Sequence, residues 1–266
     1  MKTDVCVSAR RNGTVEAYET AVVRAIRHMR ENLAEPLDLD EIGRIAATSK
    51  FHLVRVFDEI TGTTPHHFLS CLRIQRAKEL LLKPGASITD VCLEVGYNSL
   101  GTFSKTFSEL VGLSPLEFRA MPKRMTAKQF ATAIWRYLAS RKKISGPAIK
   151  GVVEGPRSPK GFVFVGTFTR GVPLGVPFSG TVMMGRGEFS IERPEMPEFH
   201  LLAALVPLSA DLTAMVANIP ISLVASLRVR QNGAGDDEKP CLRLRPLRPT
   251  DPPIVLALPA LPPLRG

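Results

Sequence analysis

Residues 87–119 read SITDVCLEVGYNSLGTFSKTFSELVGLSPLEFR, and this stretch decides the fold of the N-terminal half. Apolar residues recur at helical spacing up to Val95, and Gly96 can take the left-handed backbone that ends a helix. Phe103 and Phe107 then mark the buried stripe of a second helix. Two short helices joined by a glycine-containing turn predict a helix-turn-helix, whose second helix is shaped to enter a DNA major groove. An ordinary helical hairpin would show the same spacing.

A second copy of this pattern precedes the first. The stretch LDLDEIGRIAATSKFHLVRVFDEITG begins at Leu37, and its Leu53 and Phe57 repeat the spacing of the later phenylalanine pair. Two copies favour a pair of helix-turn-helix units over one accidental hairpin. The units are expected at about residues 38–62 and 87–111.

A connecting helix is predicted between the two units, over residues 65–82. Pro65 suits a first-turn position, and Pro84-Gly85 ends the helix. About eighteen residues span roughly 27 Å at ~1.5 Å each, which is near the roughly 34 Å of one DNA turn. One rigid body would therefore place two helices in successive major grooves on one face of the duplex.

The order and spacing of several short motifs resemble the AraC/XylS-type DNA-binding domain, over about residues 19–121. The motifs are Ala77-Lys78-Glu79-Leu80-Leu81, Ile88, Val95-Gly96-Tyr97-Asn98-Ser99, Phe103-Ser104-Lys105, Phe107, Gly112-Leu113-Ser114-Pro115 and Phe118-Arg119. The resemblance implies an all-helical domain with two helix-turn-helix units. It also implies binding to promoter DNA and, usually, activation of transcription.

The side chains expected to face DNA lie on the second helix of each unit, opposite its buried stripe. Arg55 suits a guanine edge because its planar fork matches two acceptors, and by resemblance Phe51 and Arg55 occupy positions that the family aims at bases. Leu100 and Gly101 lack hydrogen-bonding side chains, so the first unit is expected to read sequence more stringently than the second. His52 is expected to pack near the backbone or to act as a cap. The predicted DNA-binding residues are Ser49, Lys50, Phe51, Val54, Arg55, Ser99, Leu100, Gly101, Thr102 and Lys105.

The chain has 266 residues, enough for two domains, and a formal net charge of +10. Residues 1–146 hold 22 Lys+Arg against 15 Asp+Glu, whereas residues 147–266 hold 13 against 10. The positive excess coincides with the helix-turn-helix units, which favours a nucleic acid as partner. From charge alone, a basic face that is merely solvated is the alternative.

No metal site, cofactor or catalytic site is predicted, so the protein is expected not to be an enzyme. The four cysteines are far apart: Cys6, Cys71, Cys92 and Cys241. His66 and His67 are adjacent, so on a helix they point about 100° apart and do not converge on one ion; contact with solvent or phosphate is expected instead. A DNA-repair alkyl-acceptor fusion would need a reactive cysteine, and Cys6 has no neighbouring cysteines.

No apolar run is long enough to cross a bilayer and no signal sequence is evident, so a cytoplasmic location is expected.

The N-terminal half divides into three predicted segments. Residues 1–14 are polar and predicted to be a disordered arm, and residues 15–121 form the DNA-binding domain. Residues 119–143 contain eight basic and no acidic residues, which predicts a basic linker helix at 122–146. A helix that packs on one of the domains and a helix that lies along DNA or an acidic partner both remain open.

From about residue 147 the sequence changes character, because 17 of the 22 prolines lie in 147–266 and helical spacing disappears. Predicted strands cover residues 161–168, 179–184, 187–191, 199–208, 222–230 and 241–247. Roughly six to eight short strands with Pro and Gly turns indicate a small β-sandwich. The predicted fold is therefore two domains, an all-α double helix-turn-helix domain followed by a small all-β sandwich.

Residues 180–203 are similar to the carboxypeptidase-regulatory-like, transthyretin-like sandwiches in their spacing of Gly, Phe, Pro and apolar residues. Such folds host carbohydrate contacts, protein contacts or plain packing roles. No polar cluster identifies a ligand, and His200, Arg170 and Arg186 are the few candidates. The proline-rich tail from Pro249 onward is expected to add an edge strand or to dock on a partner.

These features predict a sequence-specific DNA-binding transcription regulator that is an activator by family resemblance. Its expected partners are double-stranded promoter DNA, RNA polymerase, and a small-molecule or protein effector at the C-terminal domain. The alternative is a non-specific architectural DNA-binding protein. The sequence leaves the target promoter, the effector, the oligomeric state and the sign of regulation open.

Overall fold

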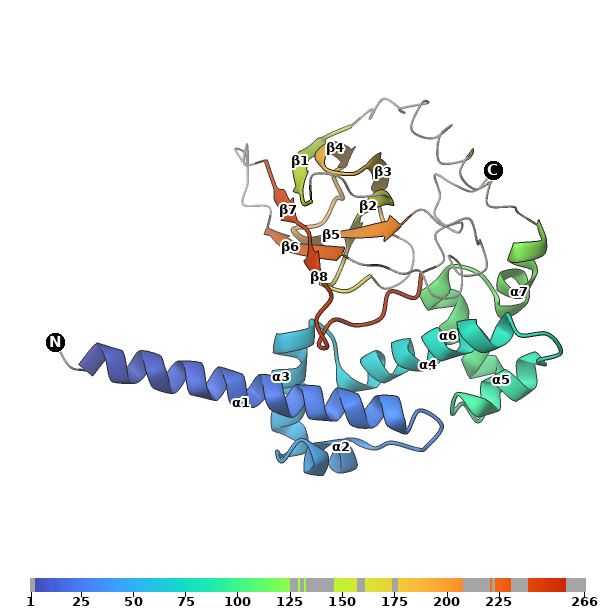
Figure 1. The fold of residues 1–266 in the computed structure, drawn as a ribbon, viewed down its shortest axis with the longest axis horizontal. Helices are drawn as coiled ribbons and strands as arrows, with labels where there is room; N and C mark the ends of the chain where they lie inside the picture. Colours follow the sequence, from blue (N-terminus) through green and yellow to red (C-terminus); the bar gives the residue numbers. More distant parts are fainter. Residues whose placement is uncertain are drawn as a thin grey trace.

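A computed structural model describes residues 3–124, 146–156, 161–173, 177–207, 223–230 and 239–256, with Gln129, Thr132 and Ile221. A helical region is followed by a sheet-rich region (Figure 1), which confirms the predicted order of the two. The helices are α1 (Thr3–Glu31), α2 (Leu39–Ile45), α3 (Lys50–Thr61), α4 (Pro65–Leu81), α5 (Ile88–Glu94), α6 (Leu100–Val111) and α7 (Pro115–Arg124). Pro122 lies inside α7 rather than before a new helix. Most of the predicted linker helix, residues 122–146, falls outside the described residues.

Helix α1 begins at Thr3, within residues 1–14, the segment for which a disordered arm is predicted. Figure 1 shows this helix projecting beyond the rest of the helical region. No proline precedes Pro36, and Gly13 costs the helix only about 1 kcal/mol relative to alanine. The helix that packs on the core from about Tyr18 onward therefore continues toward the N-terminus.

The two predicted helix-turn-helix units are confirmed as α2–α3 and α5–α6, and their second helices repeat each other. Helices α3 and α6 are both 12 residues long, with Ser49 and Ser99 as N-caps. Each serine hydroxyl accepts a hydrogen bond from a backbone N–H of the first turn, which satisfies a donor that has no partner within the helix. Both helices end at a left-handed glycine, Gly62 with φ 74° and Gly112 with φ 81°.

Helix α4 joins the two units because each of its ends belongs to a different hydrophobic core. Phe68 and Leu72 pack with α1, α2 and α3. Ile74 and Leu81 pack with α5, α6 and α7. The helix has 17 residues, about 26 Å at ~1.5 Å each, so a single rod fixes one unit relative to the other.

The C-terminal region contains two sheets. Their strands are β1 (Ala148–Glu154), β2 (Gly161–Phe168), β3 (Gly180–Met184), β4 (Gly187–Glu192), β5 (Glu198–Pro207), β6 (Leu223–Arg230), β7 (Cys241–Arg243) and β8 (Arg245–Pro246). The three-stranded sheet has the order β4-β1-β7, and the five-stranded sheet has the order β3-β2-β5-β6-β8. Strand β1 was not predicted. The prediction of one strand over residues 241–247 is wrong, because the chain leaves one sheet and enters the other at Leu244, whose side chain is buried in the core that the sheets share.

The five-stranded sheet packs on both of its faces. Val163 and Val165 of β2 point into the core shared with the three-stranded sheet. The alternate residues Phe162 and Phe164 point into the core that contains α4, α6 and α7. Side chains of a strand alternate between faces, so β2 is buried along its whole length and reads as a continuous apolar run. The sheet therefore lies between the other sheet and the second helix-turn-helix unit.

Residues 252–256 form no strand and pack against the helical region instead. Val255 is fully buried, in the same core as α4 and α7. Its carbonyl oxygen accepts a hydrogen bond of 3.0 Å from Nζ of Lys78, and that nitrogen lies 5.6 Å from the centre of the Phe118 ring. Arg245 and Asp251 form two hydrogen bonds, of 2.7 and 2.8 Å, that close the loop leading into this segment. The end of the described chain thus covers a lysine of the helical region.

Burial lowers the pKa of Lys78 to about 7. In the unfolded chain the pKa of this lysine is near its ordinary value. At a pH between the folded-state pKa and the unfolded-state pKa, the unfolded chain binds more protons than the folded chain, so the free energy of unfolding rises with pH. Between pH 6.5 and pH 8.5 we expect the free energy of unfolding of the wild type to rise by about 2 kcal/mol more than that of Lys78→Met. Chemical denaturation at the two pH values measures this difference.

Lys83→Met is the matched control because Lys83 is exposed, and it should follow the wild type. Equal pH dependence of Lys78→Met and the wild type would contradict the burial of the lysine under the C-terminal segment.

Candidate nucleic-acid interface

The predicted residues of α3 lie on the side of the helix opposite its buried stripe. Leu53 and Phe57 are buried, whereas Phe51 is 80% exposed. Burying a large apolar side chain of this kind on binding would be favourable, so Phe51 offers an apolar surface to a ligand. The predicted residues of this unit are exposed or half-buried: Ser49, Lys50, Phe51, Val54 and Arg55.

Neighbouring side chains hold the two cations of α3. Nζ of Lys50 is 3.0 Å from a carboxylate oxygen of Asp40 on α2, and it lies 5.7 Å from the centre of the Phe51 ring. Nη2 of Arg55 is 3.3 Å from Nδ1 of His52, one turn earlier. Both contacts are exposed, so each is worth little in stability. Their effect is to limit the directions in which Lys50 and Arg55 point.

The predicted residues of α6 are also on the outside of their unit. Phe103 and Phe107 are buried, and Leu100 is 45% exposed. Lys105 has a side chain 76% exposed, and its nitrogen is 4.0 Å from a carboxylate oxygen of Glu109. The predicted residues of this unit are all exposed: Ser99, Leu100, Gly101, Thr102 and Lys105.

The sheet-rich region leaves both sets of residues uncovered. It contacts the helical region through a core that includes Val111 and Phe118, on α6 and α7. None of the ten predicted residues is buried. In the described part of the chain, the two sheets therefore leave these side chains of α3 and α6 accessible.

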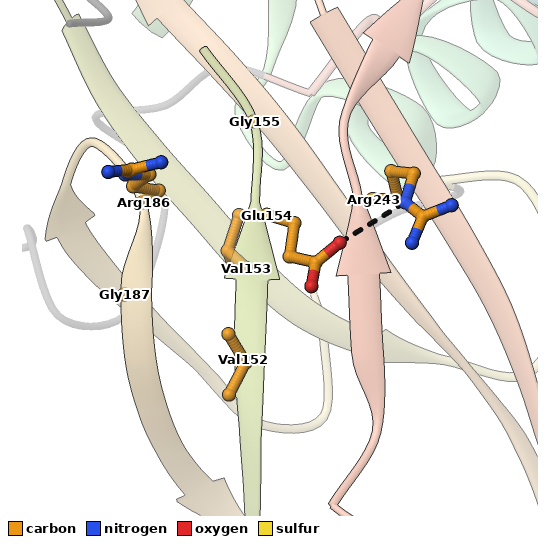
Figure 2. Close-up of a pocket in the computed structure, with 7 residues that line it drawn as sticks. All are labelled: Val152, Val153, Glu154, Gly155, Arg186, Gly187 and Arg243. Carbon is orange, nitrogen blue, oxygen red and sulfur yellow. Dashed lines mark hydrogen bonds and ion pairs between the residues drawn. The ribbon is translucent and has the colours of Figure 1, made fainter. Parts of the chain in front are cut away.

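The candidate ligand residues of the C-terminal region do not form one site. Arg186 lines a shallow depression of about 610 Å³ on the three-stranded sheet (Figure 2). In that depression Glu154 of β1 and Arg243 of β7 form an ion pair of 3.1 Å. His200 is on the five-stranded sheet, where burial and the charge of Arg228 lower its pKa. The structure thus brings Arg186 together with other charged residues but does not bring it to His200.

The adjacent histidines of α4 differ in their surroundings. His66 is exposed and His67 is half-buried. Burial, with the charges of Arg170 and His66, lowers the pKa of His67. Its Nε2 is buried, so the expectation that both histidines face solvent or phosphate is wrong for His67. In the described part of the chain, no three His, Cys, Asp or Glu side chains gather as metal ligands do. None of the described helices is long and apolar enough to cross a membrane.

Two residues beside the site were missed by sequence reasoning. Asp40 was assigned no role from the sequence, yet it pairs with Lys50 ten positions later. Tyr18 contacts His52 from α1, with the ring centres 5.0 Å apart, so His52 packs on a ring and does not cap the helix. For Asp40 the sequence offered one signal, an acidic residue on the first helix of a unit. For Tyr18 it offered none.

The chain is similar to known regulators over its helical region. A family model described as a helix-turn-helix domain matches residues 42–121. The MmsAB operon regulatory protein of Pseudomonas aeruginosa is 41% identical over 93 residues, which cover 35% of this chain and 30% of that protein. An HTH-type transcriptional regulator of the same species, ArgR, is 31% identical over 98 residues, 37% of this chain and 30% of that protein.

The solved structures that match cover a similar share of the chain. A transcriptional regulator from Chromobacterium violaceum, described as an AraC-type DNA-binding domain-containing protein, is 32% identical, with a TM-score of 0.37, and the match covers 38% of this chain and 91% of that one. The chain spans about a third of the length of the curated relatives it matches. Residues 42–121 match a helix-turn-helix domain, and the relatives that share this region are transcription regulators.

Proposed function

We propose that this protein is a sequence-specific DNA-binding transcription regulator whose helices α3 and α6 enter successive major grooves of a promoter. The observation that carries the proposal is the pair of uncovered helix faces joined by the single helix α4. An apolar ring, an arginine and a lysine on α3 supply the contacts that base edges and phosphates accept. The positive charge of the N-terminal half supports attraction to the duplex.

The two faces differ in what they offer to a base. On α3, Arg55 offers a fork for a guanine and Phe51 an apolar surface for a thymine methyl group. On α6, Leu100 and Gly101 offer only apolar contact and close approach of the backbone. We therefore propose that α3 sets most of the sequence preference and that α6 adds affinity.

Activation, RNA polymerase as a partner and an effector at the C-terminal region belong to the same proposal. Activation is proposed from the resemblance to the AraC/XylS-type domain, and the relative named as a regulatory protein of the MmsAB operon supports a regulatory role. Promoter binding would place the protein in the cytoplasm, with the polymerase. A transthyretin-like type for the C-terminal region is proposed from sequence similarity, and the two sheets with a common core are compatible with it. We also propose that the protein has no enzymatic activity and no cofactor.

A non-specific architectural protein is the second candidate, and competition distinguishes it. A regulator should keep binding its selected site in an excess of random DNA, with a preference of roughly 10³ or more. Selection from a random library followed by this competition is the decisive experiment. Equal affinity for selected and random DNA would contradict the proposed regulator and would favour the architectural role.

Arg55→Ala is expected to weaken binding to the selected site by about 1–3 kcal/mol and to relax one base position. The reason is that a bidentate contact to guanine discriminates against the other bases, whereas a phosphate contact does not. Fluorescence anisotropy with the selected site and with every single-base variant of it gives both quantities.

Arg30→Ala is the matched control because Arg30 is an exposed cation on α1 and is not on either recognition helix. This variant should lower the affinity for all DNA sequences equally or leave it unchanged. If Arg55→Ala also lowers the affinity for every sequence equally, Arg55 contacts only phosphate, and the proposal that α3 recognises bases fails.

A further inference from the structure

The ring of His52 lies between Arg55 and a tyrosine of another helix. Tyr18 of α1 meets His52 edge-to-face, with ring centres 5.0 Å apart and planes 62° from parallel. On its other side, Nδ1 of His52 is 3.3 Å from Nη2 of Arg55. Tyr18 also packs against the core of α1, α3 and α4. The contacts therefore connect Arg55 to the packed core through two rings.

The chemistry of this pair fixes the tautomer of His52. A guanidinium group only donates hydrogen bonds, so Nδ1 must accept and the proton of the neutral ring must sit on Nε2. The edge-to-face contact with Tyr18 restricts rotation of the imidazole, because aromatic pairs prefer this arrangement. A ring held in this way presents its acceptor nitrogen in a constant direction. The remaining N–H groups of Arg55 then point from the helix with less freedom than an arginine in solvent has.

The corresponding lysine of α6 has no such support. Lys105 is 50 positions after Arg55 and equivalent to it in the repeat of caps and helix lengths. Among the residues that the structure describes, its charged partner is Glu109 at 4.0 Å, and its side chain is 76% exposed. The helical repeat is therefore symmetric in its backbone and asymmetric in how its DNA-facing cations are held.

We propose that Tyr18 and His52 are positioning residues for Arg55, so that helix α1, which precedes the matched residues 42–121, contributes to the sequence preference of α3. This inference rests on the proposed function, because it concerns how Arg55 reads a base. Holding a side chain in its bound direction reduces the entropy lost on binding. The benefit applies to the base that needs this direction and not to phosphates, which accept a cation from many directions.

The test compares two pairs of variants in the full chain on the selected DNA site. Tyr18→Leu and His52→Leu remove the ring contact and the acceptor. Tyr18→Phe keeps the ring, and His52→Asn keeps an acceptor close to the place of Nδ1. We expect both leucine variants to lose roughly 3- to 10-fold of the discrimination at the one base pair that Arg55→Ala relaxes. The two conservative variants should retain it.

Several measurements separate positioning from a general loss of structure. Glu19→Ala, an exposed change next to Tyr18 on α1, should leave discrimination unchanged. Affinity for random DNA and its salt dependence should be the same in the leucine variants and the wild type. Tyr18→Leu combined with Arg55→Ala should discriminate no worse than Arg55→Ala alone. Thermal unfolding followed by circular dichroism confirms that each variant is folded under the assay conditions.

The outcomes distinguish this inference from the function on which it rests. If the library yields no enriched site, the proposed function fails and this inference falls with it. If Arg55→Ala relaxes a base position but both folded leucine variants discriminate as the wild type does, positioning by Tyr18 and His52 is overturned and the function stands. Loss of discrimination in Tyr18→Phe equal to that in Tyr18→Leu would also overturn it, because the aromatic ring would then be irrelevant.

Discussion

Gly96→Ala is expected to lower the free energy of unfolding by more than about 3 kcal/mol. Gly96 has φ +82°, and an added Cβ would lie 2.5 Å from the carbonyl oxygen of Leu33 and 2.9 Å from Nη2 of Arg73. Arg73 cannot turn away freely, because it donates hydrogen bonds of 2.9 Å to Leu33 O and 2.8 Å to Glu35 O. The turn of the second unit and the segment that follows α1 would have to separate. Urea unfolding followed by circular dichroism measures the loss.

Two substitutions isolate the steric part of this cost. Gly85 has a similar φ of +80° with nothing within 4 Å of an added Cβ, so Gly85→Ala should cost only the left-handed backbone, about 1–2 kcal/mol. Ala47 is at the matching turn of the first unit and has φ 56°, so Ala47→Gly should gain about 1 kcal/mol. Equal losses for Gly96→Ala and Gly85→Ala would show that the close contact with Leu33 is not present.

The helical region was predictable because its determinants are local. Caps, apolar spacing and glycine stops act within a few residues of the chain. The sequence shows them as Ser99, the pair Phe103/Phe107 and Gly96. The same locality made the DNA-facing side chains predictable, since residues next to the buried stripe must point outward. The start of α1 was missed because helix propagation through Gly13 depends on support farther along the helix.

The C-terminal region was harder to predict because its pairing is not local. Strand β1 contains Gly151, which weakens a strand signal, yet an added Cβ there would lie 2.5 Å from the ring of Phe189 on β4. That ring takes the space of the missing side chain, and sequence spacing does not reveal it. Likewise, nothing in the alternation around Leu244 shows that its two flanks join different sheets.

The residues that contact and orient the side chains of α3 could not be predicted, for the same reason. Asp40 and Tyr18 reach α3 from α2 and α1. Their partners are 10 and 34 positions away, so only tertiary packing brings them together. Residues that read DNA can be inferred from a helix face, whereas residues that hold them cannot.

Phe162→Ala is expected to lower the free energy of unfolding by about 3–5 kcal/mol and to loosen α6 as well as the sheet. Phe162 is 2% exposed on the face of β2 that packs against the helical region. Its removal leaves a cavity in a core that also contains Phe107 and Val111 of α6. Hydrogen exchange of the α6 amides, measured together with urea unfolding, reports whether the loss reaches the recognition helix.

Phe199→Ala is the matched control because Phe199 is 1% exposed but belongs to the core between the two sheets. It should cost a similar global free energy while local exchange in α6 stays close to the wild type. Exchange in α3 should respond to neither change, since α3 packs in a separate core with α1 and α2. If α3 and α6 respond alike to Phe162→Ala, the shared core does not single out the second unit. The expected asymmetry would make α6, and not α3, the recognition helix that a ligand of the C-terminal region can influence.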